Sequence, residues 1–221
     1  MRLYLHGGGP LLAPLAARLE GAGAEFVGAA RADTILDLSP APPGEREPWP
    51  QEARVLVLCW TGSATMLAAR DPHPWRYTGF SALPPLAEQS VIELARPLQA
   101  PMAVLDEAAA LLAGAGFETA AVPDGPGLIA ARTVACLANE AASAVAEGVA
   151  DGETIDRAMR LGTNYPRGPL EWADVIGPDA VVTLLEALER EHGGERYTPH
   201  PLLRRAAAAG LPLAALGKER T

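Results

Sequence analysis

The stretch from Asp124 to Gly177 decides the fold of the second half of this 221-residue chain. It reads DGPGLIAARTVACLANEAASAVAEGVADGETIDRAMRLGTNYPRGPLEWADVIG, with glycine and proline breaks between longer runs. Within the runs, apolar residues recur every three or four positions, which is the period of an α-helix with one buried face. We therefore predict helices over 129–149, 152–162 and 169–175, and a fourth from Pro178 to Gly193. Together they make this half an all-α domain.

The ends of these helices are also readable. Asp151 is predicted to be an N-cap, because its side chain can accept a hydrogen bond from the first turn, where Glu153 suits the positive end of the helix dipole. Gly162 is predicted to end the same helix, since glycine readily adopts the left-handed conformation of a helix stop.

The first half begins with the pattern of a βαβ unit. A short alternating strand at Arg2–His6 leads into the turn Gly7–Gly8–Gly9. A helical stripe containing Leu12 and Leu19 follows, and then a second short strand at Glu25–Gly28. A strand, glycine turn, helix and strand in this order are typical of dinucleotide-binding domains.

The remainder of the first half continues an α/β pattern. It predicts a strand at Ala32–Leu38, a loop at Ser39–Gln51, a buried parallel strand at Arg54–Cys59, a helix at Asp106–Gly114 capped by Asp106, and a strand at Ala120–Val122. We therefore predict a shortened Rossmann-like, doubly wound domain over residues 1–123 and a helical domain over residues 124–221.

Composition excludes several classes of partner. The net charge of −9 gives no basic surface for nucleic acid, and it disfavours an anionic membrane. No apolar run approaches the roughly 20 residues of a membrane span, and no secretory leader is recognisable. The two cysteines, Cys59 and Cys136, are expected to be buried free thiols. These features favour a cytoplasmic protein.

Six short blocks carry a family resemblance. In order they are DGPGLIAAR (124–132), NEA (139–141), EGVA (147–150), IDRAM (155–159), YPRGPLEWAD (165–174) and PHPLL (199–203). With these blocks in register over about a hundred residues, the second half resembles the C-terminal domain of the 3-hydroxyacyl-CoA dehydrogenases. The first half resembles the NAD-binding domain of that family in patches, without the long helical segment that the family places before its next strand.

The resemblance implies an enzyme of acyl-CoA and fatty acid metabolism that oxidises 3-hydroxyacyl-CoA to 3-ketoacyl-CoA with NAD. In the family a histidine removes the hydroxyl proton, a glutamate twelve residues later orients that histidine, and a serine and an asparagine hold substrate oxygens. Here the glutamate is retained as Glu93, but the histidine position is Ser81 and the asparagine position is Ala131. The serine position falls on Gly62 or Ser63.

The cofactor site that the resemblance implies is also altered. Gly7 and Gly9 match the first two glycines of the nucleotide-binding turn, but Leu12 stands at the third, where a glycine lets helix and strand pack closely. Pro14 removes a backbone N–H near the helix start. The second strand leads into Ala29–Arg31, where an acidic residue would bind the ribose. We therefore expect NAD binding to be weak or absent.

The other polar residues offer no replacement site. Cysteine, histidine and carboxylate residues lack metal-binding spacing, so no metal is expected. We interpret Glu171 and Asp174, which share a helix face, as structural. Arg132, Asn139 and Glu140 are expected to form a polar network. The four histidines are interpreted as surface or capping residues: His6, His73, His192 and His200. Of these, His6 lies closest to the crevice at a strand end.

Three functions stay open at this point. The chain is a dehydrogenase with a rebuilt site, or a degenerate relative that still binds an acyl-CoA or a protein partner, or a structural dimerisation module. Retained Glu93 and the glycine turn favour the first, whereas Ser81, Ala131 and Leu12 favour the second. The resemblance and the apolar helix stripes also predict a homodimer through the helical domain.

Overall fold

The computed structural model describes residues 1–39, 49–88 and 91–217. It divides the chain into two compact units, Met1–Ala131 and Arg132–Thr221. The domain boundary that the sequence predicts, after Pro123, stays a prediction. Most of the loop expected at Ser39–Gln51 lies outside the described residues.

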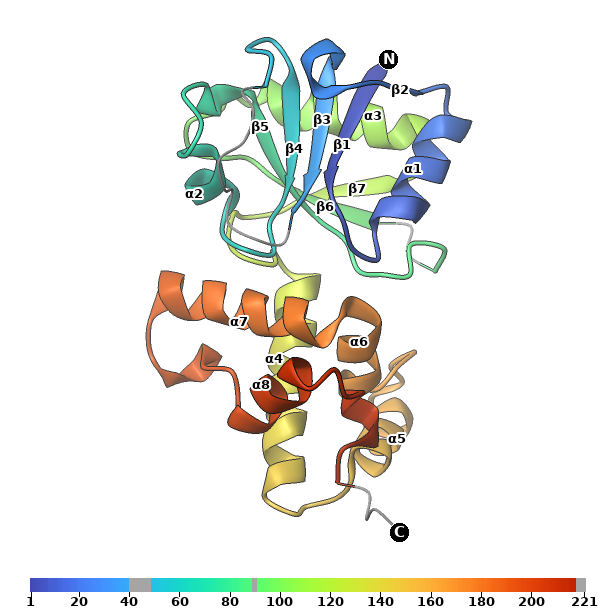
Figure 1. Ribbon diagram of the computed structural model, residues 1–221, viewed down its shortest axis with the longest axis vertical. Helices are drawn as coiled ribbons and strands as arrows, with labels where there is room; N and C mark the ends of the chain where they lie inside the picture. The colour runs from blue at the N-terminus through green and yellow to red at the C-terminus, as the bar shows by residue number, and fades with distance from the viewer. Residues whose placement is uncertain (40–48, 89–90, 218–221) are drawn as a thin grey trace. The chain divides into compact units, whose positions relative to one another are not determined.

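The first unit is built on a seven-stranded sheet with the order β2-β1-β3-β4-β5-β6-β7 (Figure 1). All neighbouring strands pair in parallel except β5 and β6, which are antiparallel. The strands are β1 Arg2–Gly7, β2 Glu25–Phe26, β3 Thr34–Leu38, β4 Arg54–Leu58, β5 Tyr77–Ser81, β6 Val91–Ala95 and β7 Glu118–Ala121.

The strand order makes the unit doubly wound. The chain leaves β1 for β2 on one side and then returns to place β3 on the other side. A reversal of this kind creates a crevice at the carboxyl ends of β1 and β3, where Rossmann-like proteins bind nucleotides. The predicted α/β fold class, with a Rossmann-like domain followed by a helical one, is therefore confirmed.

Both faces of the sheet are buried, because consecutive side chains along β3 and β4 point to opposite faces and nearly all of them are buried. Ile35, Val55 and Tyr77 lie side by side in register and pack with Leu67 of α2 (Ala64–Ala68) and with Trp49. The intervening residues belong to the opposite face, where Thr78 Oγ1 donates to the carbonyl of Val104 in α3 (Ala103–Gly114). Burial on both faces explains the nearly continuous apolar runs of β3 and β4.

One helix of the first unit, α3, begins at a different residue from the one predicted. α1 spans Leu12–Gly21, and short 3₁₀ turns, η1 Ala29–Arg31 and η2 Pro74–Arg76, precede β3 and β5. The predicted cap at Asp106 is wrong. α3 begins at Ala103 with Met102 at the cap position, and Asp106 lies inside the first turn. There its carboxylate still suits the helix dipole.

The second unit is helical, apart from two 3₁₀ turns. Its elements are α4 Ala130–Ala146 (which begins in the first unit), α5 Gly152–Thr163, α6 Pro169–Ile176, α7 Pro178–His192, η3 Glu195–Tyr197, α8 Pro201–Ala208 and η4 Leu213–Ala215. The predicted N-cap is confirmed, because Asp151 Oδ1 accepts from Thr154 N at 2.8 Å. The predicted stop at Gly162 is wrong: α5 continues to Thr163, and Asn164 takes the left-handed cap conformation (φ 57°).

Apolar stripes form the core of this unit. Val181, Leu184 and Leu188 of α7 are at most 2% exposed, so this stripe is fully covered within the chain. Among the large apolar side chains described in this unit, Leu161 (76%) and Val149 (71%) have the highest exposed fractions. Among the described residues, no helix combines the length and hydropathy that a membrane crossing requires.

Candidate functional site

Ser81 and Glu93, the residues at the expected histidine and glutamate positions, face each other across the only antiparallel pairing of the described sheet. Ser81 ends β5 and Glu93 lies in the middle of β6, as direct partners in the ladder. Directly paired residues project from the same face of a sheet, so both side chains lie at one place. The local fold therefore brings the two positions together, as an orienting carboxylate and its base would require.

The chemistry of Ser81 is that of a structural hydroxyl. Its side chain is buried (1% exposed), and Oγ accepts a hydrogen bond from Trp60 Nε1 at 3.3 Å. The hydroxyl also lies 3.4 Å from the carbonyl oxygen of Gly127, to which it can donate. A serine hydroxyl is too weak a base to take up a substrate proton near neutral pH, and here its own proton is donated to a backbone carbonyl.

Glu93 binds backbone amides at the start of a helix. Its carboxylate accepts hydrogen bonds from Ile129 N and Ala130 N, at 3.1 Å each. Ala130 is the first residue of α4, whose initial N–H groups have no partner within the helix. Glu93 is therefore the N-terminal cap of α4, supplied from a strand more than thirty residues earlier. Its negative charge also suits the helix dipole.

A second long-range carboxylate cap lies nearby. Asp124 accepts from Ala64 N at 2.7 Å and from Thr65 N at 2.8 Å, which are the first amides of α2. Ser63 occupies the N-cap position of this helix and is buried, but its hydroxyl makes no capping bond. Sequence reasoning missed the role of Asp124 because the amides it binds are about sixty positions away, and no local spacing indicates such a pair.

Ala131 lies in the first turn of α4 and is 1% exposed. A methyl group at this position can neither donate nor accept a hydrogen bond. Ser81 and Glu93 thus both contact the segment 127–130, which leads into α4, and Ala131 continues it.

The glycine turn after β1 is shaped by packing rather than by an anion site. Gly7 has a positive φ of 97°, and a Cβ there would lie 2.6 Å from the backbone nitrogen of Ser39. At the start of α1, Leu12 donates its N–H to Gly9 O (3.2 Å) and Pro14 has none. Of the first three α1 residues only Ala13 is left to donate. This is a poor cradle for a pyrophosphate, which takes several free amides at a helix start.

The side-chain contacts of the four histidines lie away from Ser81 and Glu93. The ring of His6 packs near Tyr4 and Trp49, and the ring of His73 packs near Trp75. His192 packs near Tyr197, while His200 caps α8 by accepting from Leu202 N. Throughout the described part of the chain, neither Ser81 nor Glu93 has a hydrogen bond to a histidine.

The polar residues of the second unit form structural contacts. Asn139 donates to Thr198 O and accepts from His200 N, while Arg132 donates to the hydroxyl of Tyr197. Asp174 accepts from Leu213 N and Ala214 N, and so ties α6 to η4. These bonds agree with a network of folding interactions.

Asp156 is the most deeply buried carboxylate of the second unit (2% exposed). It accepts from Leu170 N and Glu171 N at the start of α6, and burial raises the pKa of its carboxyl group. Glu171 also pairs with Arg160. Across residues 1–39, 49–88 and 91–217, no group of three or more His, Cys, Asp or Glu side chains is arranged to hold a metal ion.

Comparison with known proteins defines the class. Residues 127–219 match the family model "3-hydroxyacyl-CoA dehydrogenase, C-terminal domain". The 3-hydroxybutyryl-CoA dehydrogenase of Bradyrhizobium diazoefficiens is 34% identical over 148 residues, which cover 67% of this chain and 50% of the relative. The 3-hydroxyadipyl-CoA dehydrogenase of Escherichia coli is 49% identical over 86 residues, 39% of this chain and 18% of that protein.

The fold has the same relatives. The (S)-3-hydroxybutyryl-CoA dehydrogenase of Ralstonia eutropha superposes with a TM-score of 0.72 at 22% identity, covering 95% of this chain and 94% of that one. A Rossmann-like unit followed by a helical unit is thus a fold that this chain shares with that structure. The chain belongs to the 3-hydroxyacyl-CoA dehydrogenase family. It spans about half the length of the curated relatives that it matches in sequence.

Proposed function

We propose that this chain is a catalytically degenerate member of the 3-hydroxyacyl-CoA dehydrogenase family. In this proposal the chain acts in acyl-CoA metabolism by binding a CoA ester without oxidising it. The observation that carries the proposal is the position of Ser81. Its buried hydroxyl lies between Trp60 Nε1 and Gly127 O, where the reaction would need an imidazole. Loss of a positioned general base alone typically slows a reaction by about 10²–10⁴-fold.

The residues at the expected cofactor site do not fit NAD. Leu12 and Pro14 leave few amides to hold a pyrophosphate, and Ala29–Arg31 form a 3₁₀ turn without a carboxylate for the ribose. No hydride-transfer step is therefore assigned to this chain. The class of ligand rests on the relatives, whose names specify CoA esters of 3-hydroxy acids.

A second candidate is an active dehydrogenase with a rebuilt site. Two observations favour it: Glu93 is retained, and the turn after β1 keeps its positive-φ glycines at Gly7 and Gly9. A third candidate, a purely structural module, predicts binding of neither NAD nor a CoA ester.

Three measurements separate these candidates. The first is oxidation of 3-hydroxybutyryl-CoA with NAD at high enzyme concentration. The other two are calorimetric titrations, one with NADH and one with a 3-hydroxyacyl-CoA. The proposal expects no turnover, no micromolar affinity for NADH, and measurable CoA-ester binding. Turnover together with micromolar NADH binding would establish the active enzyme, whereas no binding of either ligand would leave the structural module.

A further inference from the structure

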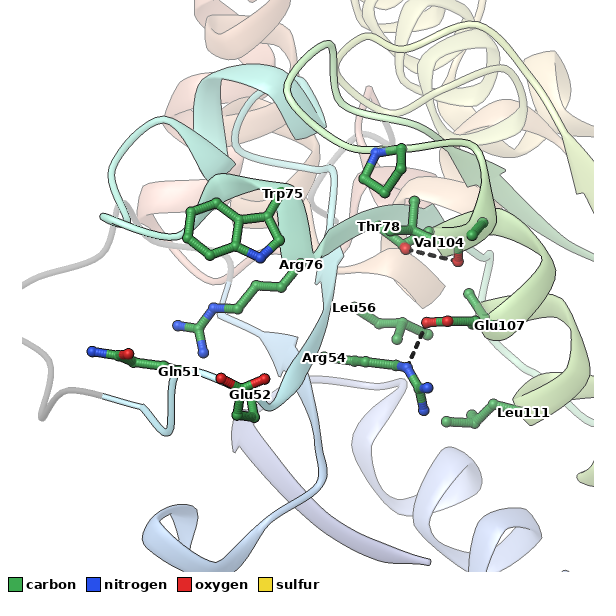
Figure 2. A pocket seen from close by; sticks show the side chains of 13 residues that line it. Gln51, Glu52, Arg54, Leu56, Trp75, Arg76, Thr78, Val104, Glu107 and Leu111 are labelled. Atoms are coloured by element: carbon green, nitrogen blue, oxygen red, sulfur yellow. Dashed lines mark hydrogen bonds and ion pairs between the residues drawn. The ribbon is translucent and has the colours of Figure 1, made fainter.

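The first unit contains a pocket far from the carboxyl ends of the strands. Its volume is about 220 Å³, and it opens between the amino ends of β4 and β5 and the start of α3 (Figure 2). Leu56 and Thr78 contribute from the strands, and Val104, Ala108 and Leu111 contribute from α3. The pocket is therefore separate from the place where a Rossmann-like sheet binds nucleotides, and it includes neither Ser81 nor Glu93.

One wall of the pocket is aromatic. Trp75, from η2, is 51% exposed and stands among the lining residues (Figure 2). His73 packs edge-on against its indole, with ring centroids 4.9 Å apart, and this contact limits the freedom of the ring. A half-exposed, positioned indole beside an aliphatic surface is suited to binding a planar ring. Stacking then buries one face of each ring, and the entropic cost is low because the indole is already held in place.

The two arginines that line the pocket are already paired with carboxylates. Arg54 Nε lies 2.5 Å from Glu107 Oε2, and Arg76 Nη2 lies 2.7 Å from Asp71 Oδ2. Glu52 adds a further carboxylate to the wall. No excess positive charge is left for an anionic ligand, so the pocket favours a neutral one.

Arg76 supplies the second, independent observation. The residue lines the pocket and is 7% exposed. Its Nη1 group donates to Pro50 O and to Ala53 O, but its buried Nε has no acceptor among the described residues. A buried donor without a partner is costly, so an acceptor that reached this group from the pocket would be bound favourably.

We propose that this pocket binds a small, neutral, planar heteroaromatic molecule, which stacks on Trp75 and directs a ring nitrogen or carbonyl toward Arg76. The volume is below the roughly 300–1,000 Å³ of sites for drug-sized ligands, so the ligand has a body of one or two rings. The chemical class of the ligand is defined by two properties: it carries a hydrogen-bond acceptor, and it carries no negative charge. This site is independent of the function proposed for the dehydrogenase positions.

Quinoline and naphthalene provide a matched pair of probes, because they share one shape and differ in a ring nitrogen that is neutral at pH 7. Ligand-observed NMR and calorimetry should give quinoline about tenfold higher affinity, the effect of one added hydrogen bond to a charged donor. 2-Naphthoate should bind more weakly than quinoline, because it brings a negative charge beside Glu52 and Glu107.

Two variants of α3 locate the binding. Ala103→Trp places an indole at the pocket lining, whereas Ala110→Trp puts the same group on an exposed position of the same helix outside the lining. Quinoline binding should be lost in the first variant and kept in the second, and Trp75→Ala should weaken it severalfold. Equal affinity for naphthalene, undiminished binding to Ala103→Trp, or no quinoline binding at millimolar concentration would each overturn the proposal.

Discussion

Ser81 and Glu93 are direct partners across the β5–β6 pairing, and both side chains bind the backbone of the same short segment. The Ser81 hydroxyl lies 3.4 Å from Gly127 O, and Glu93 accepts from Ala130 N at 3.1 Å. The two positions that the family resemblance assigns to a base and its orienting carboxylate both bind the segment at the start of α4. Two predictions test this arrangement, two test the roles of Asp124 and Asp71, and a fifth concerns assembly.

Replacing Glu93 should affect stability first. Glu93→Ala removes the cap of α4, and we expect the free energy of unfolding to fall by about 1–2 kcal/mol. Glu93→Gln should lose less of this free energy, because the side-chain amide oxygen of glutamine can still accept hydrogen bonds from the first N–H groups of the helix. Urea denaturation measures both, with Glu20→Ala on the exposed side of α1 as the control. A Glu93→Ala protein as stable as the control would remove the capping role.

Asp124 should behave in the same way for α2. Its carboxylate accepts from both Ala64 N and Thr65 N, so Asp124→Ala should cost about 1–2 kcal/mol of unfolding free energy. Hydrogen exchange of those two amides should accelerate more than exchange in the strands. If their protection stays unchanged in the variant, the cap contributes nothing.

Ser81→Ala tests whether the hydroxyl has any catalytic part. The change strips Trp60 Nε1 of its acceptor, and we expect a loss of about 1 kcal/mol in stability. Any dehydrogenase activity found for the wild-type protein should persist at a comparable rate under conditions where the variant is folded. Abolished turnover in a folded Ser81→Ala protein would show that the roles assigned through the family resemblance are wrong.

Acid should weaken the contact between Asp71 and Arg76. Although burial alone would raise the pKa of Asp71, hydrogen bonds from Arg76, His73 N and Tyr77 outweigh it and hold the pKa below its ordinary value of 3.8. A carboxyl whose folded-state pKa is lowered stabilises the fold above the unfolded-state pKa, and this stabilisation is lost as the pH falls through the folded-state value.

The matching variant is Asp71→Asn. At neutral pH it should destabilise the protein by about 2 kcal/mol or more, because the buried Arg76 loses its counter-charge. The difference from wild type should shrink as the pH falls below the ordinary Asp71 value, and thermal melts across that range measure it. A difference in stability that stays constant with pH would contradict the assignment, and Glu20→Gln, at an exposed position of α1, is the control.

The homodimer stays a prediction, but its basis changes. The α7 stripe, which was expected to need a partner, is covered within the chain: Leu185 and Leu188 are 0% exposed. The remaining apolar surface includes Leu161 and Val149 together with half-buried positions on α4. Light scattering at micromolar concentration should give twice the 23.0 kDa chain mass, and Leu161→Glu should reduce it. A single species at the chain mass would refute the dimer.

The helical unit was largely predictable because its signals are local. The breaks at Pro169 and Pro178 mark helix starts, and Asp151 caps amides only a few positions away. Asn164 was missed because glycine is the commoner residue in the left-handed cap, and Gly162 lies just before it. Propensity alone could not decide between two candidates that lie two positions apart at one helix end.

The candidate site was predictable only in part. Motif spacing placed Ser81 and Glu93 at related positions, and the β5–β6 register brings them together. What each carboxylate binds depends on tertiary contacts, so the caps made by Glu93 and Asp124 left no trace in the local sequence. The pocket beside Trp75 was missed for the same reason, since its residues come from two strands, a turn and α3.

The cap made by Glu93 has a consequence for how enzymes are recognised in genomes. A carboxylate that completes a helix start contributes to folding whether or not it also orients a histidine. Its presence in a relative therefore carries little information about turnover. Surveys that count this glutamate as a mark of activity would include inactive descendants, whereas the identity of the residue paired with it across β5 and β6 would separate the two groups.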